Sequence, residues 1–572
     1  MAAAGHILLA WAVISVVLFG LGALVAGRWL HDITISDLFW AGMSAAILLL
    51  QIWHLFFRIG LWAAIFLSAC AAAGWGLHAR LVPRLVGDLA RDKAAVLLLA
   101  GFALFTARDA AGPCWHYDTG LYGAPTVHWT ETYPIVPGLT NLHPRFGFNC
   151  STFLLFAAMD RGTWHGASQH LLSGLVMVAL AGSVFSALCR LVRDPRRSTA
   201  DWFLATLIVL LLAWLVDAVN GMSTDFPANT LSLAAIAIVF RALVERVPPQ
   251  RLALAMFLLA ATVTLKLSTA VFAAGGWGIA AWMLWTADRS PSTASEVRER
   301  RRLFLTGTAL SVALIFPWLI RGAVLSGYPL FPSTAISLPV SWRAESAAAF
   351  DRDWVLSWAR TPMSSPAKTK GTQWIGGWIK RQMHDLPEVQ LPLGVLGLGL
   401  ILIIVGKIRP RFGRESADDQ RGGTTRAAWL IFVPVLADVW FWFKLGPDPR
   451  YAQFAFWTAA AAALSLGVRR TRFPPLLLRI LLLALPAATI WMIGLSNLTA
   501  RLGPLNPVTW NLPVVRLTTF TTRGGVVLWV PVTGNQAWNA PLPSASSRGP
   551  KPPARLWLRT PGKLEDGFME HP

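Results

Sequence analysis

Long apolar runs set the first limit on how this chain can fold. Stretches of about 20 residues, long enough to cross a bilayer as helices, recur along most of its 572 residues. Charged residues make up 14% of the chain, against about 25% in a typical soluble domain. The sequence therefore predicts an all-α polytopic membrane protein. We expect about 14 transmembrane helices, at residues 7–26, 36–56, 60–77, 94–111, 167–189, 202–219, 228–244, 251–267, 270–287, 303–323, 391–407, 427–444, 451–467 and 474–495.

Basic residues concentrate in short segments between these apolar runs. The net charge is +21, but the placement of the charges follows the positive-inside pattern of membrane proteins, so we expect no nucleic-acid partner. If residues 78–93 are cytoplasmic, strict alternation puts every basic segment on that side. The opposite, outer side receives two long loops, the tail and both termini. The clusters are Arg80, Arg84, Arg91 and Lys93; Arg190, Arg193, Arg196 and Arg197; Arg298, Arg300, Arg301 and Arg302; Lys407, Arg409, Arg411 and Arg414; and Arg469, Arg470 and Arg472.

The two long outer loops and the tail have compositions of their own. The stretches "STFLLFAAM" and "WIGGWIKRQM" suit helices lying in the plane of the membrane interface. In the tail, "GGVVLWVPV" and "RLWLRT" alternate with turn residues and predict a small β-containing segment. We divide the chain into additional N-terminal helices (1–93), a transmembrane core (94–323) with the first outer loop (112–166), a second outer loop (324–390), C-terminal helices (391–495) and a tail (496–572).

A single acid stands out in the first outer loop. Asp118, in "YDTGLY", follows a predicted span by about seven residues, which places it near the lipid headgroups. A carboxylate there can act as a general base toward an acceptor hydroxyl. The alternative is a turn or cap residue, because Asp-Thr-Gly is also typical of turns.

Other polar residues are expected on the same face as Asp118. Arg145, Arg321 and Arg450 are candidate phosphate ligands, because a guanidinium matches phosphate oxygens in a bidentate manner. Lys266 is a further candidate, with snorkelling to the interface as its alternative. Further candidate substrate contacts are Tyr122, His128, Asn141, His143, Asp225, Tyr328 and Asp448, with Trp115 and Trp129 as stacking surfaces for sugar or prenyl groups.

The sequence alone leaves two questions open: whether the first outer loop binds a metal, and whether it contains a disulfide. His116, His128 and His143 could join Asp118 around a divalent metal, but their spacings match no standard motif. We therefore expect no cofactor, with a divalent metal as the alternative. Cys114 and Cys150 flank the first outer loop and could pair in an oxidising compartment. Asp217 and Asp438, inside predicted spans, are read as structural.

Several motifs resemble those of a family of uncharacterised bacterial polytopic membrane proteins. They are "DTGLY", "VPGLTNLHPRFGFNCS", "SGYPLFPS", "DPRYAQFAFW" and "WNAPLP". More broadly, the chain resembles the GT-C superfamily of glycosyltransferases. That resemblance implies a polyprenyl-phosphate-linked sugar donor and a base in the first outer loop, which Asp118 matches. It also implies lipid-phosphate contacts, which Arg450 and Lys266 match. In the superfamily this loop usually follows the first span, whereas here it follows the fourth.

The sequence thus favours a membrane glycosyltransferase on the periplasmic face of a bacterial inner membrane. It would move a sugar from a polyprenyl-phosphate donor to an envelope glycan or lipid acceptor. Two alternatives remain open: a polymerase or ligase of lipid-linked oligosaccharides, and a lipid or solute transporter.

Overall fold

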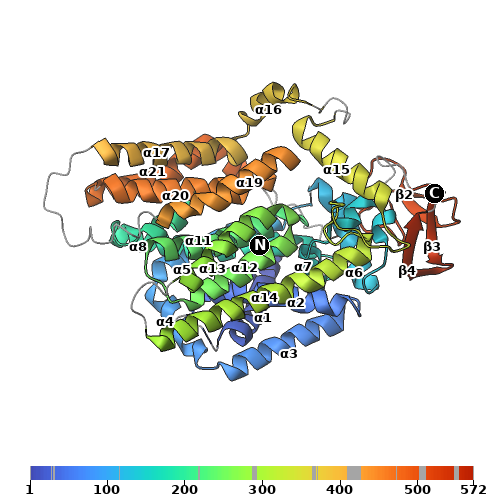
Figure 1. The fold of residues 1–572 in the computed structure, drawn as a ribbon, viewed down its shortest axis with the longest axis horizontal. Helices are drawn as coiled ribbons and strands as arrows, with labels where there is room; N and C mark the ends of the chain where they lie inside the picture. The colour runs from blue at the N-terminus through green and yellow to red at the C-terminus, as the bar shows by residue number, and fades with distance from the viewer. Residues whose placement is uncertain are drawn as a thin grey trace.

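Helices lying roughly side by side make up most of the molecule, and small β-sheets sit at one end (Figure 1). The computed structural model describes residues 2–27, 29, 33–114, 116–216, 219–286, 293–363, 369, 371–408, 427–471, 473–500, 511–545 and 553–570. The longer helices are α1 (Ala2–Ala26), α2 (Ile35–His54), α3 (Leu61–Leu77), α4 (Leu81–Arg91), α5 (Lys93–Ala110), α8 (Leu172–Arg193), α9 (Thr199–Thr206), α10 (Ile208–Trp214), α11 (Asp225–Val244), α12 (Gln250–Leu265), α13 (Ala270–Thr286), α14 (Ala294–Ser326), α17 (Leu391–Ile408), α19 (Phe432–Leu445), α20 (Gln453–Thr471) and α21 (Pro475–Ile493).

The chain is a multi-pass membrane protein. Among the described residues, nine helical segments have the length and apolarity to cross a bilayer, and a tenth is added if α3 and α4 form one broken span. The expected 14 spans therefore reduce to nine or ten on these criteria. The five other expected segments, at 60–77, 94–111, 202–219, 251–267 and 451–467, are occupied by helices that do not meet the criteria singly. The axes of α3 and α4 differ by 86°, and α12 has only 16 residues.

Two helix ends that matter for the site have clear local causes. Thr34 begins α2 with a capping box, in which its side chain accepts from the Asp37 N–H and the Asp37 carboxylate accepts from the Thr34 N–H. Gly327 ends α14 in the left-handed conformation, at φ 78°, which a glycine adopts without a Cβ penalty. These signals fix where α2 begins and where α14 ends.

The basic segments at the start of α5, the end of α8 and the connection of α20 to α21 meet at one end of the helix bundle, here called the basic end. Arg193, at the end of α8, lies 3.3 Å from Asp92 at the start of α5. Arg196 donates to the Phe473 carbonyl at 3.0 Å, which brings the α20–α21 connection to the same place. The first outer loop, the end of α14 and the tail lie at the opposite end (Figure 1). This arrangement separates the basic connections from the motif-bearing loops, as alternation of the spans predicts.

The tail forms two antiparallel two-stranded sheets, as expected for a β-containing segment. One pairs β1 (Leu517–Thr521) with β2 (Val527–Pro531), and the other pairs β3 (Leu556–Thr560) with β4 (Lys563–Glu570). Both are at the end that carries the first outer loop (Figure 1).

The expected interfacial helices differ from each other. The stretch "STFLLFAAM" forms α7 (Thr152–Met159), whose side chains from Thr152 to Ala157 are all buried in protein, so α7 does not lie in the membrane interface. The second stretch, "WIGGWIKRQM", forms α16 (Trp374–Gln382), most of whose residues are exposed or half-buried. The helix α15 (Glu345–Arg360) precedes it in the second loop. The apolarity of "STFLLFAAM" indicated burial correctly but could not say whether lipid or protein provides it.

Candidate functional site

The first outer loop folds as a succession of short helices rather than as an open loop. Gly138 and Asn149 supply left-handed turns between them, at φ 65° and 51°. Most of its side chains are buried, so the loop is a packed part of the protein. The short elements are η1 (Thr119–Gly123), α6 (Ala124–Thr132), η2 (Leu139–Asn141), η3 (Pro144–Phe148) and α7.

Asp118 lies just before η1 and is half-buried. The Tyr122 hydroxyl, one turn later, is 3.4 Å from Asp118 Oδ2 and donates to it. The buried Tyr122 ring is held edge-on by Phe148 and Phe153. Within the part of the chain that the structure describes, Asp118 has no cation within ion-pair distance. Its carboxylate is therefore positioned by a neutral hydroxyl and is not neutralised by a partner.

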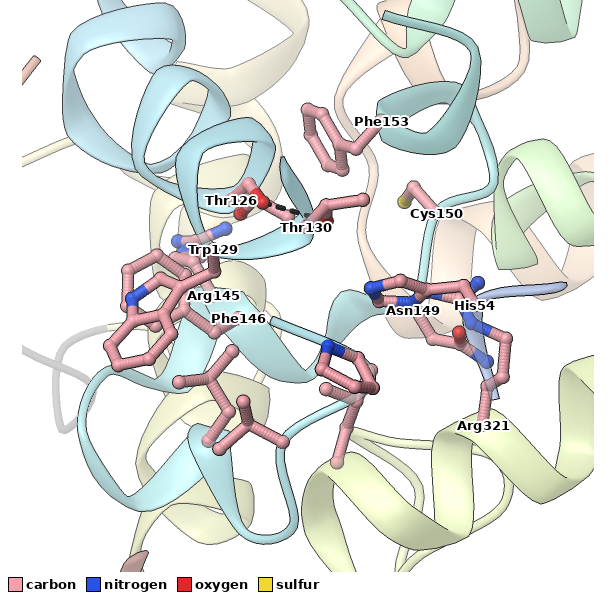
Figure 2. Close-up of a pocket in the computed structure, with 14 residues that line it drawn as sticks. His54, Thr126, Trp129, Thr130, Arg145, Phe146, Asn149, Cys150, Phe153 and Arg321 are labelled. Atoms are coloured by element: carbon pink, nitrogen blue, oxygen red, sulfur yellow. Dashed lines mark hydrogen bonds between the residues drawn. The ribbon is translucent and has the colours of Figure 1, made fainter. Parts of the chain in front are cut away.

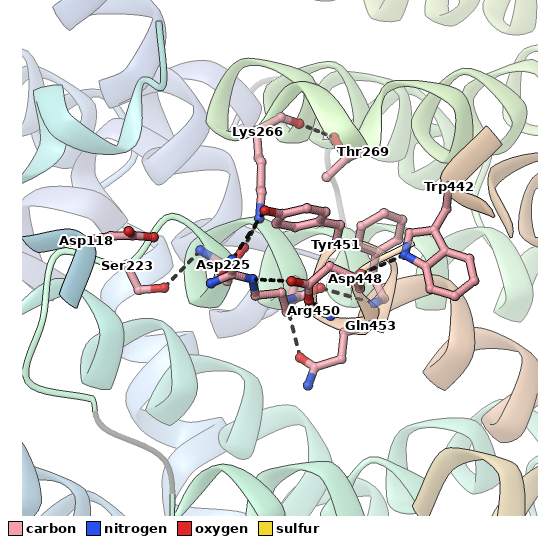
Figure 3. Close-up of polar contacts among 12 residues, drawn as sticks. Asp118, Ser223, Asp225, Lys266, Thr269, Trp442, Asp448, Arg450, Tyr451 and Gln453 are labelled. Carbon is pink, nitrogen blue, oxygen red and sulfur yellow. Dashed lines mark hydrogen bonds and ion pairs between the residues drawn. The ribbon is translucent and has the colours of Figure 1, made fainter. Parts of the chain in front are cut away.

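Three ion pairs surround the Asp118–Tyr122 pair. The Lys266 ammonium contacts Asp225 Oδ1, joining the end of α12 to the start of α11 (Figure 3). The other two join a guanidinium Nε to a carboxylate oxygen: Arg450 to Asp448 at 3.2 Å, and Arg145 to Asp351 at 3.1 Å. With Asp118 and Tyr122, the structure thus gathers the predicted residues Arg145, Asp225, Lys266, Asp448 and Arg450.

Tyr451 connects two of these pairs. Lys266 Nζ lies 4.4 Å from the centre of the Tyr451 ring, and the Arg450 guanidinium lies 5.1 Å from it. Arg450 also donates to the Tyr451 hydroxyl at 3.3 Å. Cation–π contacts of this kind hold long side chains in place. Figure 3 shows Asp118 beside the group formed by Asp225, Lys266, Arg450 and Tyr451.

The charges of this cluster influence one another. Burial lowers the pKa of the Arg145 guanidinium, but Asp351, Tyr122, Tyr451 and Asp118 together raise the pKa above its ordinary value. Burial, and then the charge of Asp118, raise the pKa of the Tyr122 hydroxyl well above 10. Tyr122 therefore remains a neutral donor toward Asp118 across the physiological pH range.

The formal charge of the cluster can be counted. Asp118, Asp225, Asp351 and Asp448 give −4 and Arg145, Lys266 and Arg450 give +3, a sum of −1. Because Asp225, Asp351 and Asp448 are each paired with a cation, the excess negative charge lies on Asp118. Asp351 and Asp448 lie within ion-pair distance of an Nε without hydrogen-bond geometry, and a guanidinium has five N–H donors, so donors remain for a ligand.

Two members of the site were missed by sequence reasoning. Asp351 lies in α15 of the second outer loop and is 1% exposed. An acid in a helix of mixed polarity carries no local signal that it will reach Arg145. Tyr451 stands inside the quoted motif "DPRYAQFAFW", so the motif itself could have identified it.

Several predicted residues have other roles. The Asn141 amide donates to the Trp342 carbonyl at 2.9 Å and the Phe568 carbonyl at 3.3 Å. Buried Tyr328 belongs to a small cluster with Phe331, and the Trp129 ring is edge-on to Phe568. These residues hold the second loop and the tail onto the first loop.

The two remaining histidine predictions are also structural. Burial, and then Arg145, lower the pKa of His143 to about 3. Its ring is therefore neutral, and Nδ1 accepts from the Arg145 N–H at 3.3 Å as the cap of η3. Burial lowers the pKa of His128. A hydrogen bond with the backbone of Ala540, in the tail, partly offsets this by raising the pKa.

Arg321 lies apart from the Asp118 cluster, against a small internal cavity of about 30 Å³. Figure 2 shows Arg321 with His54, Asn149 and Cys150 on one side of this cavity and Arg145 on the other. Arg321 Nη2 is 3.5 Å from His54 Nδ1. His54, at the end of α2, was not anticipated.

The candidate disulfide is not formed, since Cys114 and Cys150 are both free thiols. Cys114 interacts with Thr119 and with the backbone of His116, whereas Cys150 Sγ lies 3.6 Å from the Phe148 carbonyl. The two cysteines therefore belong to different neighbourhoods of the loop.

The metal hypothesis gains no support from the geometry. Within the described residues, no group of three or more His, Cys, Asp or Glu side chains is arranged to hold a metal ion. Asp438 is buried within α19. Trp115 and Asp217 lie outside the described residues.

The tail closes over the Asp118 loop. The backbone N–H of Trp538, in "WNAPLP", donates to the Gly120 carbonyl in "DTGLY" at 2.9 Å. A Cβ at Gly120 would lie 2.4 Å from the Trp538 ring, so this contact requires glycine. The Tyr117 hydroxyl donates to Asn535 at 2.6 Å. Two motifs more than 400 residues apart thus form one surface.

The fold and site define a polytopic helical membrane protein with a polar site at one end of its bundle, assembled from two long loops and covered by a tail. The chain belongs to the family described as a domain of unknown function, DUF8201, whose model matches residues 6–457. No curated protein and no solved structure matches the chain. The matched residues include both outer loops and every ion pair of the site, and leave the tail outside.

Proposed function

We propose that this protein is a membrane glycosyltransferase that moves a sugar from a polyprenyl-phosphate donor to an envelope glycan or lipid acceptor. One observation carries the proposal. Of the four aspartates that the described part of the chain gathers here, Asp118 is the one without a cation within ion-pair distance, and it lies among three cations at one end of a membrane-embedded bundle.

Asp118 would serve as the general base. Its carboxylate is half-buried and accepts only the long 3.4 Å contact from Tyr122. An acceptor hydroxyl can therefore approach it without first breaking an ion pair. Proton removal of this kind contributes about 10²–10⁴-fold to a rate.

Arg145 and Arg450 would hold the donor phosphate. Ion pairs with Asp351 and Asp448 hold both guanidinium groups at the site, and Arg450 also donates to the Tyr451 hydroxyl. The terminal N–H donors can then bind phosphate oxygens and take up the charge that develops as the sugar leaves. Lys266, held by Asp225 and the Tyr451 ring, adds a third positive charge.

The arrangement of the bundle supports the proposed location. Basic connections gather at the end opposite to Asp118, and basic connections face the cytoplasm in most membrane proteins. The site would then face the periplasm of a bacterial inner membrane, where an extruded lipid-linked donor can reach it.

The test is a profile of prenyl-phosphate sugars and surface glycans in a strain lacking this protein. We expect a prenyl-phosphate monosaccharide to accumulate and one glycan to lose a residue, with rescue by wild type and not by Asp118→Asn. The matched control is Asp353→Asn, an exposed acid on α15, which should rescue fully. Equal rescue by Asp118→Asn would contradict the base assignment.

The same profile separates the alternatives. Accumulation of a diphosphate-linked oligosaccharide in place of a monosaccharide would indicate a polymerase or ligase. Unchanged glycans, with altered uptake or lipid distribution, would indicate a transporter.

A further inference from the structure

Arg321 presents a buried positive charge that the Asp118 site does not use. It lies near the end of α14 and is 4% exposed. Its one hydrogen-bond neighbour is His54 Nδ1, at 3.5 Å from Nη2. Nε and Nη1 are buried and have no partner, and no carboxylate lies within ion-pair distance among the residues that the structure describes. An unpaired charge in a low-dielectric interior is strongly destabilising, so the fold requires compensation here.

The cavity beside Arg321 offers donors rather than acceptors. Because Arg321 donates to His54 Nδ1, a neutral His54 ring carries its proton on Nε2, and the ring also interacts with the Tyr133 backbone. The nearby hydroxyls of Thr126 and Thr130 donate to backbone carbonyls of α6 and its flank. Asn149 Oδ1 is an unpaired acceptor. The unpaired N–H groups of Arg321, one on Nε and two on Nη1, thus outnumber this acceptor three to one.

We propose that this cavity is a binding site for a small inorganic anion of the size of chloride. The space open to the centre of a water-sized group is about 30 Å³, which is enough for a halide ion. A water molecule could satisfy two of the donors but would leave the charge of Arg321 uncompensated. A monovalent anion satisfies the donors and the charge together. The inference is independent of the proposed transferase activity.

The cavity also explains why an anion here matters for structure. Its walls come from α2, α6, the η3–α7 region and α14, which are far apart in the sequence (Figure 2). An anion bound to Arg321 would link the ends of α2 and α14 to the first outer loop. Binding should therefore stabilise the folded chain by an amount that grows with the logarithm of the anion concentration above Kd.

The test uses the purified full-length protein in detergent, without lipid donor. We expect the apparent Tm to rise by a few degrees when sodium gluconate is replaced by sodium chloride or bromide at constant ionic strength, and to keep rising with the logarithm of the halide concentration. Equilibrium dialysis with radioactive chloride should give about one bound ion per chain. Arg321→Gln should remove the halide dependence. The matched control is Arg190→Gln: Arg190 is bidentate to Asp201, so its loss should lower Tm but leave the halide effect intact.

The proposal is overturned if wild-type protein binds no chloride and its Tm is the same in both salts. It is also overturned if inorganic phosphate, but not chloride, stabilises the protein through Arg321, since the cavity would then belong to a phosphate site. The dialysis of wild type decides the question even if Arg321→Gln does not fold.

Discussion

In the proposed reaction, a donor phosphate must approach the negative charge of the Asp118 carboxylate. Because the other charges of the cluster are paired, removing this charge should help donor binding while it removes the base. We predict that Asp118→Asn lowers kcat by about 100- to 10,000-fold and leaves KM for the donor unchanged or lower. Steady-state kinetics with purified protein measure both parameters. A raised KM with normal kcat would show instead that Asp118 binds substrate and takes no proton.

His143 gives a prediction about acid stability. Its folded-state pKa is about 3, against about 6.5 when unfolded. The unfolded chain therefore binds the extra proton between these values, so stability should fall as the pH falls from about 6.5 toward 3. His143→Asn keeps an acceptor suited to capping η3 and removes the titration, so it should flatten this part of the pH–Tm curve. His384→Asn, at an exposed position, is the control and should leave the curve unchanged.

The residues of the site were only partly predictable. Four residues of the site lie in short polar motifs between apolar runs, where polar side chains are easy to recognise in the sequence. They are Asp118, Tyr122, Arg145 and Arg450. The partner of Arg145 was not visible, because Asp351 comes from a helix in another loop and its contact depends on how the loops dock. Cys114 and Cys150 failed as a pair for the same reason, since flanking one loop does not make two residues neighbours.

At the scale of elements, the tail is joined to the first outer loop by a contact that tolerates no side chain at Gly120. We predict that Gly120→Ala destabilises the protein by about 1–3 kcal/mol, as overpacking does, and makes the tail more sensitive to proteases. Limited proteolysis and thermal unfolding measure the two effects. Trp538→Ala removes the ring, so adding Gly120→Ala to it should cost little more. Additive effects of the two changes would show that Gly120 and Trp538 do not touch.

Helices were more predictable than their environment. Apolar runs identified the segments that became helices, because length and hydropathy are local properties of the sequence. Whether a helix faces lipid or protein, and whether it bends, is not determined by its local sequence. The α3–α4 bend and the burial of α7 both arise from neighbours that the segment itself does not specify.

At the scale of the molecule, the basic end and the Asp118 end should lie on opposite sides of the membrane. We predict that a single cysteine replacing exposed Asp353 reacts with an impermeant maleimide in intact cells. One replacing Asp88 on α4 should react only after the cells are permeabilised. Both are placed in a variant without the four native cysteines. The opposite labelling pattern would put the site in the cytoplasm and would require a different donor.

The docking of the tail also sets the order in which the parts of the site come together during synthesis of the protein. Phe568 exchanges contacts with Pro137 and Asn141, and Asn141 lies 427 residues earlier in the chain. The ribosome therefore delivers the Asp118 loop to the membrane long before the segment that covers it. Until that segment emerges, the loop lacks its cover and the chain cannot complete its site. Incomplete chains left in the membrane by interrupted translation would carry the carboxylate and the arginines without the tail that covers them.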